Sequence, residues 1–161
     1  MRLSVNMVNK DIKKAIRIIH KRLENKKIKW ALVGSTNMQL QGIQVEPRDL
    51  DIVIQHKDLN KVSEIFSDYS ASAVKELKTL TGEPAWEVKS IINGVEIQFF
   101  GGNEADTYVS KLLASKIIMI KLDSIEIPCF TLEAEAQTYK ETNREHKAHL
   151  IQEFLDTHSI N

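Results

Sequence analysis

The apolar residues near the start of the chain recur at the spacing of one helix face. They are Ile12, Ala15, Ile16, Ile19 and Leu23. Lysines and arginines occupy the opposite face, so this segment predicts an amphipathic helix that packs against a core. Asn9 or Asp11 precedes the apolar residues and can cap the first turn of this helix.

Short β-prone runs and brief helices follow. Residues 29–33 predict a buried strand, and residues 36–41 predict a short helix that ends near Gly42. Residues 50–55 alternate strongly between apolar and polar side chains, which is typical of a second strand. Apolar residues return at helical spacing over residues 58–68, where we expect another helix.

From residue 73 onward the apolar residues alternate with a period of two, which predicts strands. The expected strands are residues 73–80, 86–92, 95–100, 116–121 and 125–130. Asn93-Gly94 is a strong two-residue hairpin signal, and Asp123-Ser124 is a second candidate hairpin.

Two further helical segments lie in the second half of the chain. One is expected at residues 104–113, after a break at Gly101-Gly102. The other is a tail from 132 to about 157, divided into two pieces near Thr142-Asn143.

The order of these elements predicts the fold class. Alternating helices and strands followed by antiparallel hairpins favour an α/β (α+β) fold, in which helices pack against a mixed, largely antiparallel sheet. The chain has 161 residues and no internal repeat, low-complexity tract or linker, so residues 1–161 are expected to form a single domain.

Charge and composition exclude several classes of partner. The 22 basic and 22 acidic residues balance, so generic DNA binding is not expected. No apolar run approaches the roughly 20 residues that a membrane helix needs. A single cysteine, Cys129, excludes an internal disulfide. We therefore expect a cytoplasmic protein that does not contact membranes.

The segment with the clearest chemistry begins where the first strand ends. Gly34-Ser35 follows this strand and starts a helix, and free N–H groups at such a helix start attract phosphate. Glycine lets a phosphate approach the main chain, and the serine hydroxyl adds a donor. Asp49 and Asp51 follow, two residues apart on a strand, so both carboxylates project from one face. Paired acids of this kind favour Mg²⁺ shared with substrate phosphates.

Glu96 is the third acid of this hypothesis. It lies between Val95 and Ile97 directly after the Asn-Gly turn, and it meets the two aspartates if its strand pairs beside residues 50–55. Such a residue can activate an attacking hydroxyl. An exposed position on the strand, without function, is the alternative for Glu96.

Gly34-Ser35, Asp49-x-Asp51 and the later Glu96 resemble the signature of the DNA-polymerase-β-like nucleotidyltransferase superfamily. EPRDLDIVI at residues 46–54 resembles its small bacterial and archaeal members, which include toxin–antitoxin components. The resemblance implies the nucleotidyltransferase fold, an NTP donor and two Mg²⁺ ions held by Asp49, Asp51 and Glu96.

The same resemblance extends to basic residues. The C-terminal segment with Arg144 and Lys147 resembles a helix of the family that often has a basic element, and both side chains could face the triphosphate. Arg48 could hold a phosphate or steady the aspartates. For each of the three, the alternative is a solvated surface charge.

The sequence thus predicts a Mg²⁺-dependent nucleotidyltransferase that moves an NMP group from an NTP to a hydroxyl. The acceptor, whether a small molecule, a protein or RNA, is open. The alternatives are a nucleotide-binding module without turnover and an antitoxin-like subunit that acts through a protein partner.

Overall fold

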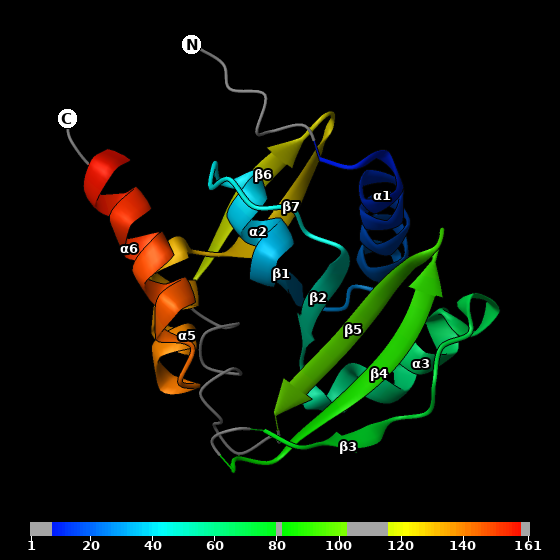
Figure 1. Ribbon diagram of the computed structural model, residues 1–161. Helices are drawn as coiled ribbons and strands as arrows, with labels where there is room; N and C mark the ends of the chain where they lie inside the picture. The colour runs from blue at the N-terminus through cyan, green and yellow to red at the C-terminus, as the bar shows by residue number, and fades with distance from the viewer. Residues whose placement is uncertain (1–7, 80–81, 103–115, 159–161) are drawn as a thin grey trace.

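The computed structural model describes residues 8–79, 82–102 and 116–158 (Figure 1). Its first helix, α1, spans Lys10–Asn25, and the Asn9 side chain caps it by accepting hydrogen bonds from the N–H groups of Asp11 and Ile12. Asn9 is therefore the cap. All five residues of the predicted apolar face are buried, as the spacing indicated.

In the part of the chain that the structure describes, seven strands form one mixed sheet in the order β3-β4-β5-β2-β1-β7-β6 (Figure 1). The strands are β1 (Trp30–Val33), β2 (Asp49–Ile54), β3 (Lys75–Leu77), β4 (Ala85–Ile92), β5 (Val95–Gly102), β6 (Ile117–Leu122) and β7 (Ile125–Phe130). The pairs β2–β5 and β1–β7 are parallel and the other four are antiparallel. The predicted fold class, a mixed and largely antiparallel sheet with packed helices, is confirmed.

The other helices of the described ranges are the short α2 (Gly34–Leu40) and α3 (Leu59–Ile65) and the longer α5 (Leu132–Glu141) and α6 (Glu145–His158). One-turn 3₁₀ helices lie at His56–Asp58 and Ser67–Tyr69. The predicted division of the tail is confirmed, because Asn143 takes the left-handed conformation (φ 59°) between α5 and α6. The helix expected over 58–68 is shorter, with 3₁₀ turns at both ends.

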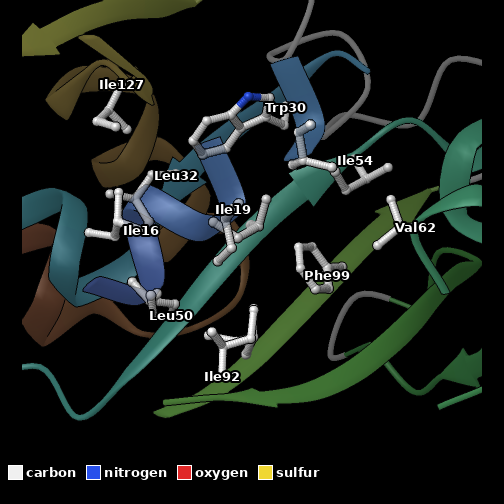
Figure 2. Packing of buried hydrophobic residues seen from close by; sticks show 14 of the residues in the cluster. Ile16, Ile19, Trp30, Leu32, Leu50, Ile54, Val62, Ile92, Phe99 and Ile127 are labelled. Atoms are coloured by element: carbon white, nitrogen blue, oxygen red, sulfur yellow. The ribbon is translucent and has the colours of Figure 1, made fainter. Parts of the chain in front are cut away.

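The main core lies between one face of the sheet and the helices α1 and α3. Figure 2 shows Ile16 and Ile19 of α1 above the sheet residues Leu50 and Phe99, and all four side chains are almost fully buried. Successive side chains of a strand point to opposite faces of the sheet. In β2, Leu50, Ile52 and Ile54 point into the core. Asp49 and Asp51 therefore point to the other face.

The opposite face of the sheet is covered in part by the C-terminal helices. Ala134 of α5 packs with Ala31, Val53 and Phe130, which come from three different strands. A further apolar cluster joins α2, α5 and α6, and it includes Met38, Leu132, Tyr139 and Ile151. Figure 1 shows α5 and α6 well apart from α1 and α3. This arrangement leaves the acid-bearing end of β2 beside the C-terminal helices.

Two sequence predictions are corrected by the strands. Gly101 and Gly102 do not break the chain but end β5, where a Cβ on Gly101 would lie 2.0 Å from the carbonyl oxygen of Ile54. Glycine is required there because the parallel neighbour β2 approaches so closely. The strand expected over 73–80 is limited to Lys75–Leu77.

The helix expected at 104–113 lies outside the described residues. Among the helices that the structure describes, none combines the length and apolar character needed to cross a bilayer.

Candidate active site

The site begins at the junction of β1 and α2. Val33, the last residue of β1, pairs with Asp51 of β2, and α2 starts at the next residue, Gly34. Gly34 has φ 80°, and a Cβ at this position would lie 2.8 Å from Oδ2 of Asp51. A side chain would therefore be strained by the backbone and would strike the carboxylate. The glycine lets the turn lie directly against Asp51.

A hydrogen bond fixes the other acid of the pair against the same helix. The Thr36 hydroxyl donates to the backbone carbonyl of Asp49 at 3.0 Å, so the first turn of α2 is tied to the first residue of β2. The predicted strand–turn–helix and the Asp-x-Asp strand are thus in contact.

The parallel pairing of β2 with β5 decides where Glu96 lies. Glu96 is the register partner of Asp49, and Gln98 is the partner of Asp51. Register partners in neighbouring strands project from the same face of a sheet. The pairing predicted for the third acid is therefore present, with Glu96 beside Asp49. Both of these residues are exposed.

The electrostatics show which charges act on Asp51. Burial and, to a smaller extent, the neighbouring Asp49 raise the pKa of Asp51 to about 6, while Arg144 and Lys147 act in the opposite direction. Like charges that raise a carboxyl pKa favour either a proton or a cation at the site. Two residues of the C-terminal segment, more than ninety positions later in the sequence, thus act on Asp51.

Tyr139 of α5 holds both cations. The guanidinium carbon of Arg144 lies 4.8 Å from the centre of the Tyr139 ring, and Nζ of Lys147 lies 5.4 Å from it. Cations are attracted to the face of an aromatic ring. The Arg144 Nε also donates to the Thr142 hydroxyl at 3.1 Å. Arg144 and Lys147 are half-buried, they pack on the ring of Tyr139, and both charges act on Asp51. We call this arrangement the Tyr139 shelf.

Glu135 is a residue of this region that the sequence interpretation missed. Its side chain lies on α5, is only 3% exposed, and accepts hydrogen bonds from the Gly34 N–H and from Nδ2 of Asn37, both at 2.7 Å. Burial raises the pKa of Glu135 to about 7, against the lowering effect of these two donors. The Gly34 N–H, which the sequence suggested for phosphate, is therefore already occupied.

A signal for Glu135 was present in the sequence. Leu132, Ala136 and Tyr139 form an apolar helix face at spacings of four and three, and Glu135 falls on the same face between two alanines. A charged residue at a position that the helical period predicts as buried indicates a special role.

Two clefts, each of about 370 Å³, meet at Asp51. The first lies along α5 and includes Gly34, Asp51, Glu135, Tyr139 and Arg144 in its lining. The second lies over β4 and β5 and includes Asp49, Asp51, Lys89, Glu96 and Gln98. Gln98 borders both clefts, and its Nε2 donates to the Glu87 carboxylate at 2.7 Å.

The other predicted residues lie around these clefts. Ser35 is half-buried in the first turn of α2, and Arg48 is exposed directly before β2. The described residues that line the two clefts do not include Ser35, Arg48 or Lys147.

The donor set is consistent with Mg²⁺ bound jointly by the protein and a substrate. Within the described ranges, no three His, Cys, Asp or Glu side chains are gathered tightly enough to hold a metal by themselves. Mg²⁺ is commonly bound by one or two carboxylates together with substrate phosphates rather than by a complete protein cage. The Asp49–Asp51 pair, with its mutual repulsion, matches that mode.

Comparison with solved structures identifies the fold. The chain is similar to TM1012 of Thermotoga maritima, a protein assigned as a nucleotidyltransferase, with 24% identity and a TM-score of 0.73 over 93% of this chain and 96% of that one. It is also similar to ANT(2")-Ia in complex with adenylyl-2"-tobramycin, with 9% identity and a TM-score of 0.58 over 92% and 98% of the two chains. A solution structure of ANT(2'')-Ia gives 13% identity and a TM-score of 0.55 over 88% and 84%.

The family follows from the sequence match. No curated protein sequence matches the chain. The model of the aminoglycoside-2''-adenylyltransferase family, however, matches residues 15–153, which include the Gly-Ser turn, all three candidate acids and the C-terminal basic pair. The chain therefore belongs to the aminoglycoside-2''-adenylyltransferase family and is an enzyme of the nucleotidyltransferase class.

Proposed function

We propose that the chain transfers AMP from ATP to a hydroxyl group of an acceptor, in a reaction that depends on Mg²⁺. The observation that supports this most strongly is the position of Asp51. It lies against the Gly34 turn, beside Asp49 on the same strand face, and close enough to Arg144 and Lys147 of the C-terminal segment for both charges to act on it.

On the donor side, the triphosphate would lie between the first turn of α2 and the Tyr139 shelf. Arg144 and Lys147 would neutralise phosphate oxygens, and the Ser35 hydroxyl would donate to one of them. Arg48, which is exposed beside the acid pair, would bind at the outer edge of the phosphates.

Asp49 and Asp51 would hold Mg²⁺ together with the phosphates. Glu96 is the proposed third ligand, and it would have to move closer to the pair when the nucleotide binds, because the described acids do not form a three-ligand cluster by themselves. Bound there, the metal would supply positive charge to the reacting phosphate and to the leaving pyrophosphate. The two-ion arrangement implied by the superfamily resemblance is part of this proposal.

On the acceptor side, Glu96 would take the proton of the attacking hydroxyl. The acceptor oxygen forms a bond to the α-phosphorus, the bond from that phosphorus to the bridging oxygen breaks, and pyrophosphate leaves with the electron pair. Glu96 is exposed and lines the second cleft, so an acceptor can reach it.

The first acceptor to test is tobramycin, because ANT(2")-Ia is bound to an adenylylated form of it. The second cleft contains the carboxylates of Asp49 and Glu96, which would attract protonated amines. Protein and RNA acceptors, and a protein partner, are the other candidates.

The proposal is tested by transfer of label from α-³²P-ATP to tobramycin, with and without Mg²⁺. Asp51→Asn should abolish label transfer and the Mg²⁺-dependent part of ATP binding, while the exposed Asp156→Asn should leave both unchanged. Mg²⁺-dependent ATP binding that survives in Asp51→Asn would refute the metal assignment. Mg²⁺-dependent ATP binding without transfer to tobramycin, RNA or lysate proteins would favour the non-catalytic module.

We also propose that the whole chain folds as one domain. The clusters on the two faces share the strands of a single sheet, which supports this organisation. A single cooperative transition with coincident fluorescence and circular dichroism curves is expected.

A further inference from the structure

Glu135 is an acidic residue in the buried interior, where a charged carboxylate is unfavourable. The side chain is 3% exposed, and burying a carboxyl group disfavours its charged form unless hydrogen bonds compensate. Its neighbours on the helix, Ala134 and Ala136, are small and apolar. An apolar residue would satisfy the packing of α5 at this position, so the carboxylate calls for another explanation.

The two hydrogen bonds of Glu135 converge on one oxygen. The Gly34 N–H and the Asn37 Nδ2 both donate to Oε2 at 2.7 Å. Asn37 Nδ2 also donates to the Phe130 carbonyl, and Gln41 Nε2 donates both to that carbonyl and to Oδ1 of Asn37. One oxygen of α5 therefore binds two groups at the start of α2, in addition to the Thr36 bond that ties α2 to β2.

Gly34 connects Glu135 to Asp51, because it contacts both side chains. Gly34 bonds to Glu135 through its N–H, and the position of a Cβ on the same residue would be 2.8 Å from Oδ2 of Asp51. A small movement of Gly34 therefore changes its separation from the Asp51 carboxylate. Glu135, Gly34 and Asp51 also line the same cleft, together with Arg144.

We propose that Glu135 is a positioning residue for the donor nucleotide: by accepting from Gly34 and Asn37 through one oxygen, it fixes the Gly34-Ser35 turn against Asp51. This inference rests on the proposed function, because the turn is taken to bind the phosphates. Glu135 does not touch the reacting atoms in this proposal. It acts through the geometry of the turn, and it links that turn to the helical pair that presents Arg144.

Because both donors bond to one oxygen of Glu135, three substitutions of this residue are informative. Glu135→Gln retains a side-chain oxygen at the same reach, and one oxygen is sufficient for both donors. Glu135→Ala removes the acceptor, and Glu135→Asp keeps the charge but withdraws the oxygen by one methylene. Positioning thus predicts that Gln preserves the function, whereas Ala and Asp both impair it.

The experiment measures the affinity for α,β-methylene-ATP with Mg²⁺ by calorimetry, on variants shown to be folded by circular dichroism. Glu135→Ala and Glu135→Asp should weaken binding by about tenfold, and Glu135→Gln by less than about threefold. Glu133→Ala, an exposed acid of the same helix, should bind as the wild type. If Glu135→Ala fails to fold, Glu135→Asp gives the same test.

A second control separates positioning from general loss of stability. Ile16→Ala creates a cavity on the far face of the sheet, so it should lower the urea midpoint without changing nucleotide affinity. If Ile16→Ala and Glu135→Ala both weaken binding in proportion to lost stability, the positioning role is wrong.

The remaining outcomes are also decisive. Wild-type affinity in Glu135→Ala or Glu135→Asp would overturn the inference while leaving the proposed function intact. Loss of binding in Glu135→Gln equal to that in Glu135→Ala would show that charge matters and not the hydrogen-bonded position. No nucleotide binding by the wild type would refute the proposed function itself.

Discussion

Replacing Glu135 by glutamine should change how the stability of the protein depends on pH. Burial raises the pKa of this carboxyl group to about 7 in the folded protein, against 4.5 for the free group. Below pH 4.5 both the folded and the unfolded chain hold the proton. Between pH 4.5 and 7 the unfolded chain loses it first, so the folded state is progressively destabilised as the pH rises.

The size of the effect follows from the difference of about 2.5 between the pKa of about 7 in the folded protein and the pKa of 4.5 in the unfolded chain. At about 1.4 kcal/mol for each pKa unit, the wild type should lose about 3 kcal/mol of unfolding free energy by pH 7 from this group. Glutamine does not titrate, and its oxygen can still accept from Gly34 and Asn37. The variant should therefore gain stability relative to the wild type over this range.

The assay is urea unfolding of both proteins at half-unit pH steps from 4 to 8, in the absence of nucleotide. The quantity to plot is the difference between the two unfolding free energies, because contributions of other groups cancel in it. Glu133→Gln, which changes an exposed acid of the same helix, serves as the control. A flat difference for Glu135→Gln would refute the argument that burial governs this carboxyl group.

Three other substitutions test the geometry. Gly34→Ala should cost about 1–3 kcal/mol from the positive φ, and should also weaken Mg²⁺–nucleotide binding because its Cβ lies 2.8 Å from Oδ2 of Asp51; a denaturant titration and calorimetry measure the two effects. Gly101→Ala should destabilise the fold strongly, visible as a lowered melting temperature, because its Cβ would lie 2.0 Å from the Ile54 carbonyl oxygen. Tyr139→Leu should reduce nucleotide affinity several-fold, measured by calorimetry, since it removes the ring under the two cations.

Gly34→Ala has a matched control, and each of the three substitutions has a result that would contradict its reasoning. Gly94 has φ 79° and nothing within 4 Å of an added Cβ, so Gly94→Ala imposes the same backbone strain without a clash. If it weakened nucleotide binding as much as Gly34→Ala does, the close approach to Asp51 would be irrelevant. An unchanged melting temperature in Gly101→Ala would show that the β2–β5 pairing is looser than described. Full affinity in Tyr139→Leu would mean that the basic residues need no aromatic support.

Much of the secondary structure was fixed by local sequence. The five-residue apolar face of α1, the Asn93-Gly94 hairpin and the division of the C-terminal tail all follow from periodicity and turn chemistry within a few residues. Asp49 and Asp51 share a strand face for the same reason, because successive side chains of a strand alternate. The local part of the candidate site was therefore predictable, although the roles of its residues remain predictions.

Only the tertiary structure decided which distant segments meet. The sequence could state the pairing of Glu96 with Asp49 as a condition, but parallel pairing of β2 with β5 depends on the whole sheet order. Gly101 looked like a chain break because the approach of the Ile54 carbonyl is invisible in one segment. Glu135 reaches Gly34 across 101 residues, and its burial results from the packing of α5 on the sheet. The periodicity of the sequence describes a single helix or strand, whereas burial and contact depend on how two elements pack together. The sequence therefore determined the separate parts of the site, and the packing of the elements determined how these parts come together.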